Sequence, residues 1–154
     1  IAYYPHPKSC IYKLNSRFNS VFVVMDIIKL QGTDKKLYEL IAPLVLNPAV
    51  LRQNNNYPFK TGPKYTWYIA IEKEQILGFI PIKQTSVSSL MINNYYIKGD
   101  NLTILDKLLS EILANINSDI ELWATVHKRH VQSYKLKDFR THIEWKNYER
   151  MLYF

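Results

Sequence analysis

The sequence has 154 residues, of which 47% are hydrophobic and 21% charged, and its formal net charge is +7. This length and composition predict a single folded domain and exclude an intrinsically disordered chain, and no apolar run approaches the roughly 20 residues of a membrane span. Because twenty basic residues face thirteen acidic ones, a polyanion such as nucleic acid is the first partner to consider.

Residues 1–24 are predicted to form an N-terminal extension ahead of a domain that spans residues 25–154. Two prolines and a polar stretch over residues 15–20 are typical of a loose segment or an extra hairpin. The segment lacks the apolar stretch and cleavage site of a secretory signal peptide. Cys10 is the only cysteine, which excludes an intramolecular disulfide and predicts a reducing, cytoplasmic location.

The next segment predicts one strand and two helices. The apolar run over residues 21–30 is typical of a buried strand. A cap at residue 33 or 34 can start a helix whose apolar residues recur up to residue 45, and Pro43 is expected to kink or shorten it. The Asn-Pro pair at residues 47–48 predicts a second, short helix. Residues 54–65 are rich in turn residues and are long enough to shape a substrate entrance.

Three antiparallel strands and a helix are expected in the middle of the chain. β-branched and aromatic residues predict strands over residues 66–72, 76–84 and 89–97, the first two at hairpin spacing. Thr103 and Asp106 have the spacing of a capping box at the start of a helix. The apolar residues of that helix share one stripe, and Ser118-Asp119 is expected to end it.

The last third predicts a strand over residues 120–126, a helix over residues 127–139 and one or two strands over residues 141–154, with a break near residues 146–147. Taken in order, the elements predict an α/β domain with a mixed rather than purely parallel sheet.

The net charge is concentrated at the two ends of the chain. Residues 1–24 contain three basic and no acidic residues, and residues 125–154 contain seven basic and three acidic ones. Residues 25–124 contain ten of each and are neutral. The excess therefore indicates either a solvated surface or a local anion site where the last third meets the core.

The order of elements resembles the GCN5-related N-acetyltransferase (GNAT) superfamily. Residues 131–139, entered from a strand, are similar to its late helix, in which a tyrosine precedes a Gly-Phe pair. Here the tyrosine is Tyr134, the phenylalanine is Phe139, and Asp138 takes the position of the glycine. The resemblance implies a GNAT-like α/β fold, with a mostly antiparallel central sheet and helices on both faces. It also implies that Tyr134 is a catalytic residue, the general acid that protonates the leaving coenzyme A thiolate.

The turn before the predicted middle helix resembles the superfamily's pyrophosphate loop only in its position. The family has Arg/Gln-x-x-Gly-x-Gly/Ala there, and this chain has Asp100 at the first position and none of the glycines in register, so it resembles a divergent member with a degenerate motif. Free backbone amides and a helix N-terminus bind anions without cationic side chains. The resemblance implies acetyl-CoA as co-substrate and a set of cofactor-binding residues that comprises Tyr95, Tyr96, Ile97, Gly99, Asn101, Leu102 and Thr103.

The group that accepts the proton of the attacking amine stays open. The strand over residues 89–97 contains no carboxylate, and strand alternation turns either Asn93 or Asn94 toward the core or cleft. We take Asn94 as a catalytic candidate that hydrogen-bonds the substrate, and a satisfied core amide is the alternative. His127 and His130 have suitable pKa values for a base but are more typical of surface histidines, and Glu72 is expected to face solvent. No metal site is predicted.

Aromatic stretches over residues 57–59, 65–68 and 93–96 can line an acceptor pocket or pack within strands. We expect a coenzyme A-dependent N-acyltransferase that acetylates an amine of a small molecule or peptide. Its partners are then a coenzyme A thioester and an amine acceptor, with a homodimer possible and no membrane. One alternative is an inactive GNAT-fold binding or regulatory module. Another is a GNAT-like protein that binds nucleic acid or modifies a base, a reading that no recognition motif supports.

Overall fold

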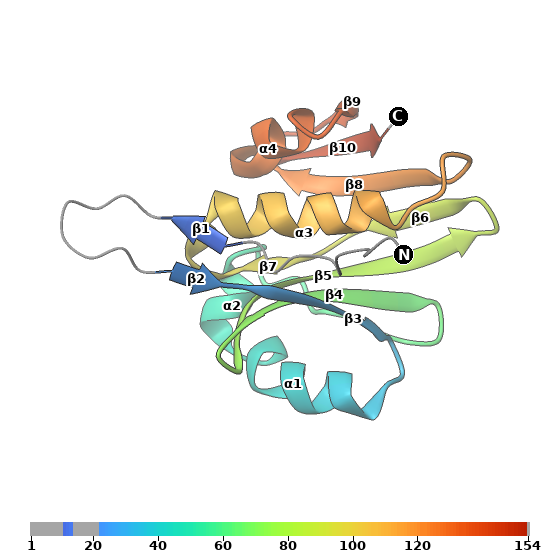
Figure 1. Ribbon diagram of the computed structural model, residues 1–154. Coiled ribbons are helices and arrows are strands. Elements are labelled where there is room, and N and C mark those ends of the chain that lie inside the picture. Colours follow the sequence, from blue (N-terminus) through green and yellow to red (C-terminus); the bar gives the residue numbers. More distant parts are fainter. Residues whose placement is uncertain (1–10, 14–21, 154) are drawn as a thin grey trace, which may run out of the picture.

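A mixed sheet of eight strands organises the molecule (Figure 1). The computed structural model describes residues 11–13 and 22–153. The strands of the sheet are β3 (Asp26–Gln31), β4 (Tyr65–Glu72), β5 (Gln75–Ser86), β6 (Ser89–Ile92), β7 (Tyr96–Ile97), β8 (Glu121–His127), β9 (Phe139–Glu144) and β10 (Tyr148–Tyr153). Their order is β3-β4-β5-β6-β8-β10-β9, and β7 pairs with β5. Only β6 and β8 pair in parallel, so the prediction of a mixed, mostly antiparallel sheet is confirmed.

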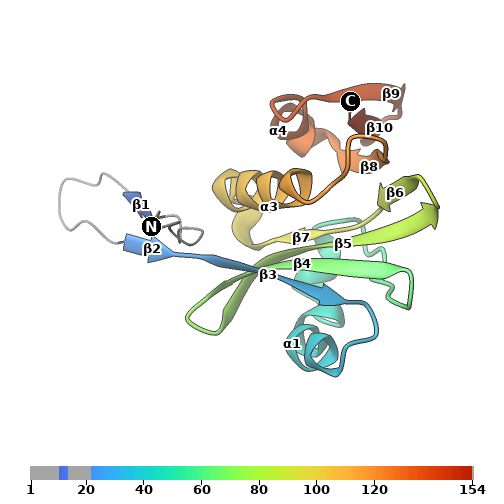
Figure 2. The ribbon, with the colours of Figure 1, turned by 45° about the vertical axis from the view of Figure 1, so that its right-hand side comes forward.

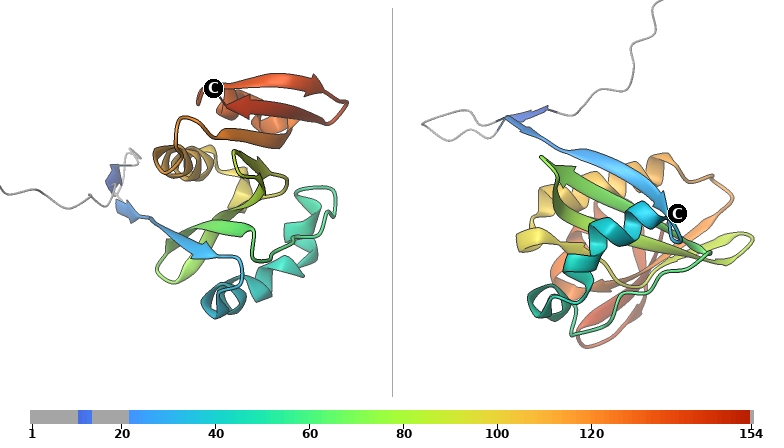
Figure 3. Two further views of the ribbon diagram at one scale, coloured as in Figure 1. Left: turned by 90° about the vertical axis from the view of Figure 1, so that its right-hand side faces the viewer. Right: turned by 90° about the horizontal axis from the view of Figure 1, so that it is seen from below.

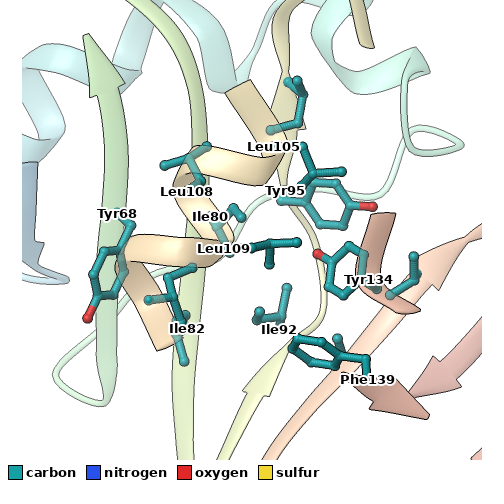
Figure 4. Close-up of a cluster of buried hydrophobic side chains, with 14 of the residues drawn as sticks. Tyr68, Ile80, Ile82, Ile92, Tyr95, Leu105, Leu108, Leu109, Tyr134 and Phe139 are labelled. Atoms are coloured by element: carbon teal, nitrogen blue, oxygen red, sulfur yellow. The ribbon is translucent and has the colours of Figure 1, made fainter. Parts of the chain in front are cut away.

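Helices cover both faces of this sheet, as expected (Figures 2 and 3). They are α1 (Lys35–Val45), α2 (Pro48–Arg52), α3 (Leu102–Ala114) and α4 (Val131–Lys135). The larger core joins α3 and α4 to one face, where Leu105, Leu108 and Leu109 are fully buried (Figure 4). On the other face, Leu37 and Ile41 of α1 pack against Trp67 and Phe79. α1 therefore covers the β3–β5 half of that face.

The start of α3 differs from the predicted capping box. Asn101 is the N-cap, and its side-chain oxygen accepts a hydrogen bond from the Thr103 amide at 2.9 Å. Thr103 thus lies inside the helix, and Asp106 forms an ion pair with Lys137 at 2.9 Å. The helix ends at Ala114, before the predicted Ser118-Asp119. Asparagine is as good an N-cap as threonine or better, so the sequence of this turn is compatible with a helix that begins after Asn101 as well as with one that begins after Thr103.

The predicted strand over residues 89–97 is interrupted by a bulge. Met91 pairs with Lys83 and Tyr96 pairs with Phe79, so one extra residue lies between the two registers. β-bulges bend a strand and re-aim its side chains, and they are frequent next to active sites. Asn93, Asn94 and Tyr95 therefore belong to no strand.

The predicted helix over residues 127–139 is also shorter than expected. A 3₁₀ turn over Lys128–His130 leads into α4, which ends at Lys135. Asp138 then takes a positive φ of 67° before Phe139 begins β9. This is the backbone conformation that favours glycine and that aspartate tolerates, so it is compatible with the expected match of Asp138 to the glycine of the GNAT pattern.

Part of the predicted N-terminal extension falls within the described residues. β1 (Ile11–Lys13) and β2 (Phe22–Val24) form a two-stranded antiparallel sheet, and β3 follows directly after Met25. Residues 1–10 and 14–21, with Cys10, lie outside the described residues. Among the residues described, no helix is long and apolar enough to cross a membrane.

Candidate active site

The candidate site lies where two parallel strands separate. β6 and β8 pair from Ser89 opposite Glu121 to Ile92 opposite Ala124. Beyond Ile92 the chain loses β8 as a partner and stays paired with β5 alone through β7, while β8 continues with β10 as its partner. The sheet therefore has an opening in its hydrogen-bonding pattern between β7 and the end of β8.

A cavity of about 830 Å³ opens on the face of the sheet opposite α3 and α4. Thr125 belongs to that face because it alternates with Ala124 and Val126, which are buried in the α3–α4 core. This volume falls within the range of small-molecule sites. The lining residues are Asn54, Tyr57, Pro58, Phe59, Lys60, Tyr65, Pro81, Lys83, Met91, Asn93, Asn94, Thr125, Trp145, Tyr148 and Arg150.

This lining bears on two predictions from the sequence. The loop over residues 54–65 supplies six lining residues, so it lies at the cavity, and its part in a substrate entrance stays a prediction. Of the aromatic stretches, Tyr57, Phe59 and Tyr65 line the cavity, and their role toward an acceptor stays a prediction. Trp67 and Tyr68 are buried in the core instead.

Three buried side-chain polar atoms of the described residues have no hydrogen-bond partner, and two of the three residues line the cavity. They are Thr125 Oγ1, Arg150 Nε and Tyr134 Oη. Thr125 and Arg150 face each other across β8 and β10, and both line the cavity. A buried polar group without a partner costs about 1–3 kcal/mol. Such groups beside a cavity indicate a ligand that supplies the missing partners.

Asn94 lies at the cavity wall and holds the neighbouring loop. Its side-chain Nδ2 donates to the Tyr57 backbone carbonyl at 3.0 Å, and its side-chain Oδ1 accepts from the side-chain Nδ2 of Asn54. Tyr148 donates in turn to the side-chain oxygen of Asn54. Asn94 therefore fixes the loop over residues 54–57, and its role toward a substrate stays a prediction.

Tyr134 lies on α4, behind the cavity, and is completely buried. Its ring packs edge-on against Phe139 at 5.0 Å, and in Figure 4 its oxygen points toward Tyr95. Burial, and then the neighbouring phenol of Tyr95, hold the pKa of Tyr134 well above its ordinary value. Tyr134 therefore stays protonated at neutral pH, the state that a general acid needs.

His130 is buried rather than exposed, so its interpretation as a surface histidine is wrong. Its Nδ1 lies 2.7 Å from Tyr95 Oη, and its Nε2 lies 2.9 Å from Asp100 Oδ1. Burial, with a smaller contribution from Arg129, lowers the pKa of His130 below its ordinary value of 6.5. Burial also raises the pKa of Tyr95. A neutral His130 then donates from Nε2 to Asp100 and accepts at Nδ1 from the Tyr95 phenol.

The other two base candidates lie elsewhere. His127 caps the 3₁₀ turn, because its Nδ1 accepts from the Arg129 amide at 3.2 Å, and its ring packs against Tyr148 at 5.2 Å. Glu72 lies at the β4–β5 turn, opposite Gln75, and does not line the cavity.

The predicted cofactor residues cluster at the β7–α3 junction. Gly99 has a positive φ of 63°, and Asn101, Leu102 and Thr103 are exposed at the start of α3. Asp100 does not present a free negative charge here, because Arg129 Nε pairs with it at 3.0 Å.

Ile97 already has partners for both of its backbone groups. Its amide donates to Gln53 Oε1 at 2.9 Å, and its carbonyl accepts from Gln53 Nε2 at 2.5 Å. Tyr95 is buried, and Tyr96 packs its ring against Phe79 at 5.6 Å.

Several cavity residues were not found from the sequence. Trp145, Tyr148 and Arg150 reach the cavity from the turn before β10 and from β10 itself, for which the sequence predicted a strand but no face. Thr125 and Lys83 lie on predicted strands in positions that carried no chemical signal. The alternation of buried and partly exposed residues along β10 is the one pattern that distinguishes this face.

No known family profile matches the sequence, and no curated protein matches it either. Solved structures match its fold. An acyl-CoA N-acyltransferase from Pseudomonas aeruginosa has a TM-score of 0.65 at 15% identity over 84% of this chain and 99% of that one. A GNAT family acetyltransferase from Elizabethkingia anophelis, with acetyl-CoA bound, has a TM-score of 0.55 at 13% identity over 83% of this chain and 95% of that one. The Campylobacter jejuni N-acetyltransferase PseH in complex with acetyl coenzyme A has a TM-score of 0.53 at 17% identity over 83% of this chain and 96% of that one. These similarities show that the chain has the GNAT fold.

Proposed function

We propose that this chain is a divergent GNAT enzyme, an N-acyltransferase that uses acetyl-CoA to acetylate an amine. The observation that carries the proposal is the separation of β7 from β8 beside a cavity of about 830 Å³. In this proposal the thioester lies along the separated strands, and the amine reaches it from the cavity. The GNAT-fold structures with acetyl-CoA bound support this choice of co-substrate.

Acyl transfer needs a held thioester, a neutral amine and a proton for the leaving thiolate. We assign the proton donor to Tyr134, whose hydroxyl is protonated and has no hydrogen-bond partner among the described residues. The β7–α3 junction, with Gly99, Asn101, Leu102 and Thr103, is the proposed site for the pyrophosphate. Tyr95, Tyr96 and Ile97 are proposed to lie along the pantetheine, and Asn94 to position the acceptor.

Acetyl-CoA is expected to bind this protein and to raise its melting temperature. A ligand that binds only the folded state stabilises it by RT ln(1 + [L]/Kd), about 2.7 kcal/mol at a hundredfold excess over Kd. The measurement is a thermal shift series with acetyl-CoA, followed by calorimetry, with adenosine monophosphate as control ligand. If millimolar acetyl-CoA produces neither a shift nor heat while the protein is folded, the proposal is wrong.

A second candidate function, an inactive binding or regulatory module, is favoured by the contact between Gln53 and Ile97. The Gln53 side chain takes both backbone groups of Ile97, which in the proposed enzyme face the pantetheine. Arg129 also donates to the Gln53 carbonyl and so holds this residue in place. Access of the coenzyme to β7 then requires Gln53 to leave.

Replacing Gln53 with Ala distinguishes the two candidates. If Gln53 competes with pantetheine, its removal frees the strand and lowers the Kd for acetyl-CoA. The decrease is about three- to tenfold if Gln53 blocks the site in most molecules of the wild type. Calorimetry of Gln53→Ala against the exposed control Gln75→Ala measures this difference. A lower Kd with turnover in Gln53→Ala would support the enzyme, and a lower Kd without turnover would support the inactive module. An unchanged or higher Kd would argue against pantetheine binding at this edge.

The nucleic-acid alternative is weakly supported, because several basic side chains of the last third of the chain already form ion pairs. In the last third of the chain Lys128 pairs with Glu144 at 2.5 Å, Arg129 pairs with Asp100, and Lys137 pairs with Asp106. The proposal keeps the cytoplasmic location expected from the single cysteine and allows a homodimer.

A further inference from the structure

We infer that the acceptor is an amine that also carries an anionic group, a carboxylate or a phosphate, next to an apolar or aromatic part. This inference rests on the proposed N-acyltransferase function and names its substrate class. It comes from the charges, the unpartnered polar atoms and the aromatic walls of the cavity.

The cavity is lined by cations and by no carboxylate. Lys60, Lys83 and Arg150 line it, and none of its fifteen lining residues is Asp or Glu. None of the three forms an ion pair with a described residue, whereas Lys128, Arg129 and Lys137 each do. Three uncompensated cations around one cavity attract an anion and repel a dication.

Arg150 is held in place to meet that anion. Its guanidinium lies 5.5 Å from the centre of the Trp145 ring, and its buried Nε has no partner among the described residues. Thr125, its neighbour across β8 and β10, offers a second unpartnered polar atom, Oγ1. A carboxylate or phosphate oxygen between the two side chains can accept from both, and charge-assisted hydrogen bonds of this kind are stronger than neutral ones.

Lys83 extends the positive wall on the other side of the cavity. Its Nζ lies 6.0 Å from the centre of the Tyr65 ring, and both side chains line the cavity. Tyr57, Phe59 and Trp145 add apolar surface, of which Tyr57 and Trp145 are exposed. An aromatic or apolar part of the acceptor can pack against these rings.

The same charges bear on the missing general base. Nearby cations disfavour an ammonium group and so lower its pKa. The acceptor amine would therefore lose its proton to solvent more readily in this cavity than in water. Because Glu72 lies away from the cavity and no carboxylate lines it, this effect gives the neutral amine that attack on the thioester requires.

Matched pairs of primary amines test the inference. Tyrosine is compared with tyramine, and O-phosphoethanolamine with ethanolamine, with putrescine as a dication. Binding is measured by calorimetry, and turnover by thiol release from acetyl-CoA. We expect the anionic member of each pair to bind and react about tenfold better or more, a typical effect of one desolvated charge pair. Which pair shows the larger preference distinguishes a carboxylate from a phosphate.

Variants locate the effect in the cavity. Arg150→Gln and, as an independent second variant, Lys83→Gln are expected to reduce binding of the anionic member about tenfold and so to narrow its preference over the uncharged-tail member of the pair. Lys36→Gln, an exposed lysine on α1, removes the same charge outside the cavity and is expected to change neither.

The outcomes separate this inference from the proposed function. If acetyl-CoA binds but tyramine, ethanolamine or putrescine is preferred, or no amine of the panel binds at millimolar concentration, the inference is overturned and the proposed function stands. If the anionic members bind in an Arg150-dependent way but acetyl-CoA does not bind, the anion site stands and the proposed function fails. Preferences that are the same in Arg150→Gln and Lys83→Gln as in the wild type also overturn the inference.

Discussion

Replacing Tyr134 with Phe is expected to lower kcat/KM by about 10²- to 10⁴-fold, the usual contribution of a general acid. The phenol is fully buried, and its pKa lies well above the ordinary value, so it carries a proton that it can donate to the departing thiolate. Its hydroxyl makes no hydrogen bond of ordinary geometry to a described residue, and the nearby Tyr95 phenol keeps His130 as its partner, so removing the Tyr134 hydroxyl leaves no group unpaired. The melting temperature of Tyr134→Phe should therefore equal or exceed that of the wild type.

Three measurements make this prediction specific. Turnover is followed with the best acceptor of the amine panel, the Kd for acetyl-CoA by calorimetry, and the melting temperature by thermal unfolding. Tyr153→Phe is the matched control, because Tyr153 also packs its ring against Phe139, at 5.5 Å, but from β10. Turnover that survives in Tyr134→Phe would show that this residue is a core tyrosine and that another group protonates the thiolate.

The fold could be predicted because its elements carry strong local patterns. α3 has its apolar residues on one stripe, and Leu105, Leu108 and Leu109 are all buried. The hairpin of β4 and β5 is bounded by a short turn at Lys73 and Glu74, both with positive φ. Such local preferences predict the folded structure because tertiary packing favours the same helix and strands.

The bulge between β6 and β7 could not be predicted in the same way. Its cause lies outside the segment, since Asn94 hydrogen-bonds to Tyr57 and Asn54, about 40 residues earlier in the chain. Single-sequence patterns describe periodicity within a segment and contain no information on such partners. The opening between the strands, which defines the candidate site, therefore has no signal within either segment.

The chemistry around His130 was missed for a related reason. Its two neighbours in the sequence, Arg129 and Val131, suggest a basic surface turn, whereas its contacts are with Tyr95 and Asp100, 35 and 30 residues away. The predicted cofactor residues were near one another in sequence, so their clustering at the β7–α3 junction was found. The clustering of the cavity cations could not be predicted, because Lys60, Lys83 and Arg150 come from three distant segments of the sequence.

His130→Ala is expected to destabilise the protein by about 2–4 kcal/mol, through the cavity left by the ring and the loss of partners for Tyr95 and Asp100. The ring is 1% exposed and joins both side chains in one chain of hydrogen bonds. Urea unfolding at neutral pH measures the change. The double variant His130→Ala/Tyr95→Phe should lose less than the sum of its single variants, because the phenol left unpaired by the first change is absent. His142→Ala, on exposed β9, is the control.

The sign of the pH dependence gives a second test of the same group. Burial lowers the pKa of His130 in the folded protein below the value of 6.5 that it has when unfolded. Above 6.5 both states carry a neutral ring, but as the pH falls through 6.5 the unfolded chain takes up the proton first. The free energy of unfolding therefore falls between 6.5 and the lower pKa of the folded state. His127, whose pKa burial also lowers, adds to this slope. His130→Ala should therefore reduce this slope, measured by urea unfolding across this pH range. An unchanged slope would mean that folding does not shift the pKa of His130, and a steeper slope would mean that the imidazolium rather than the neutral ring faces Asp100.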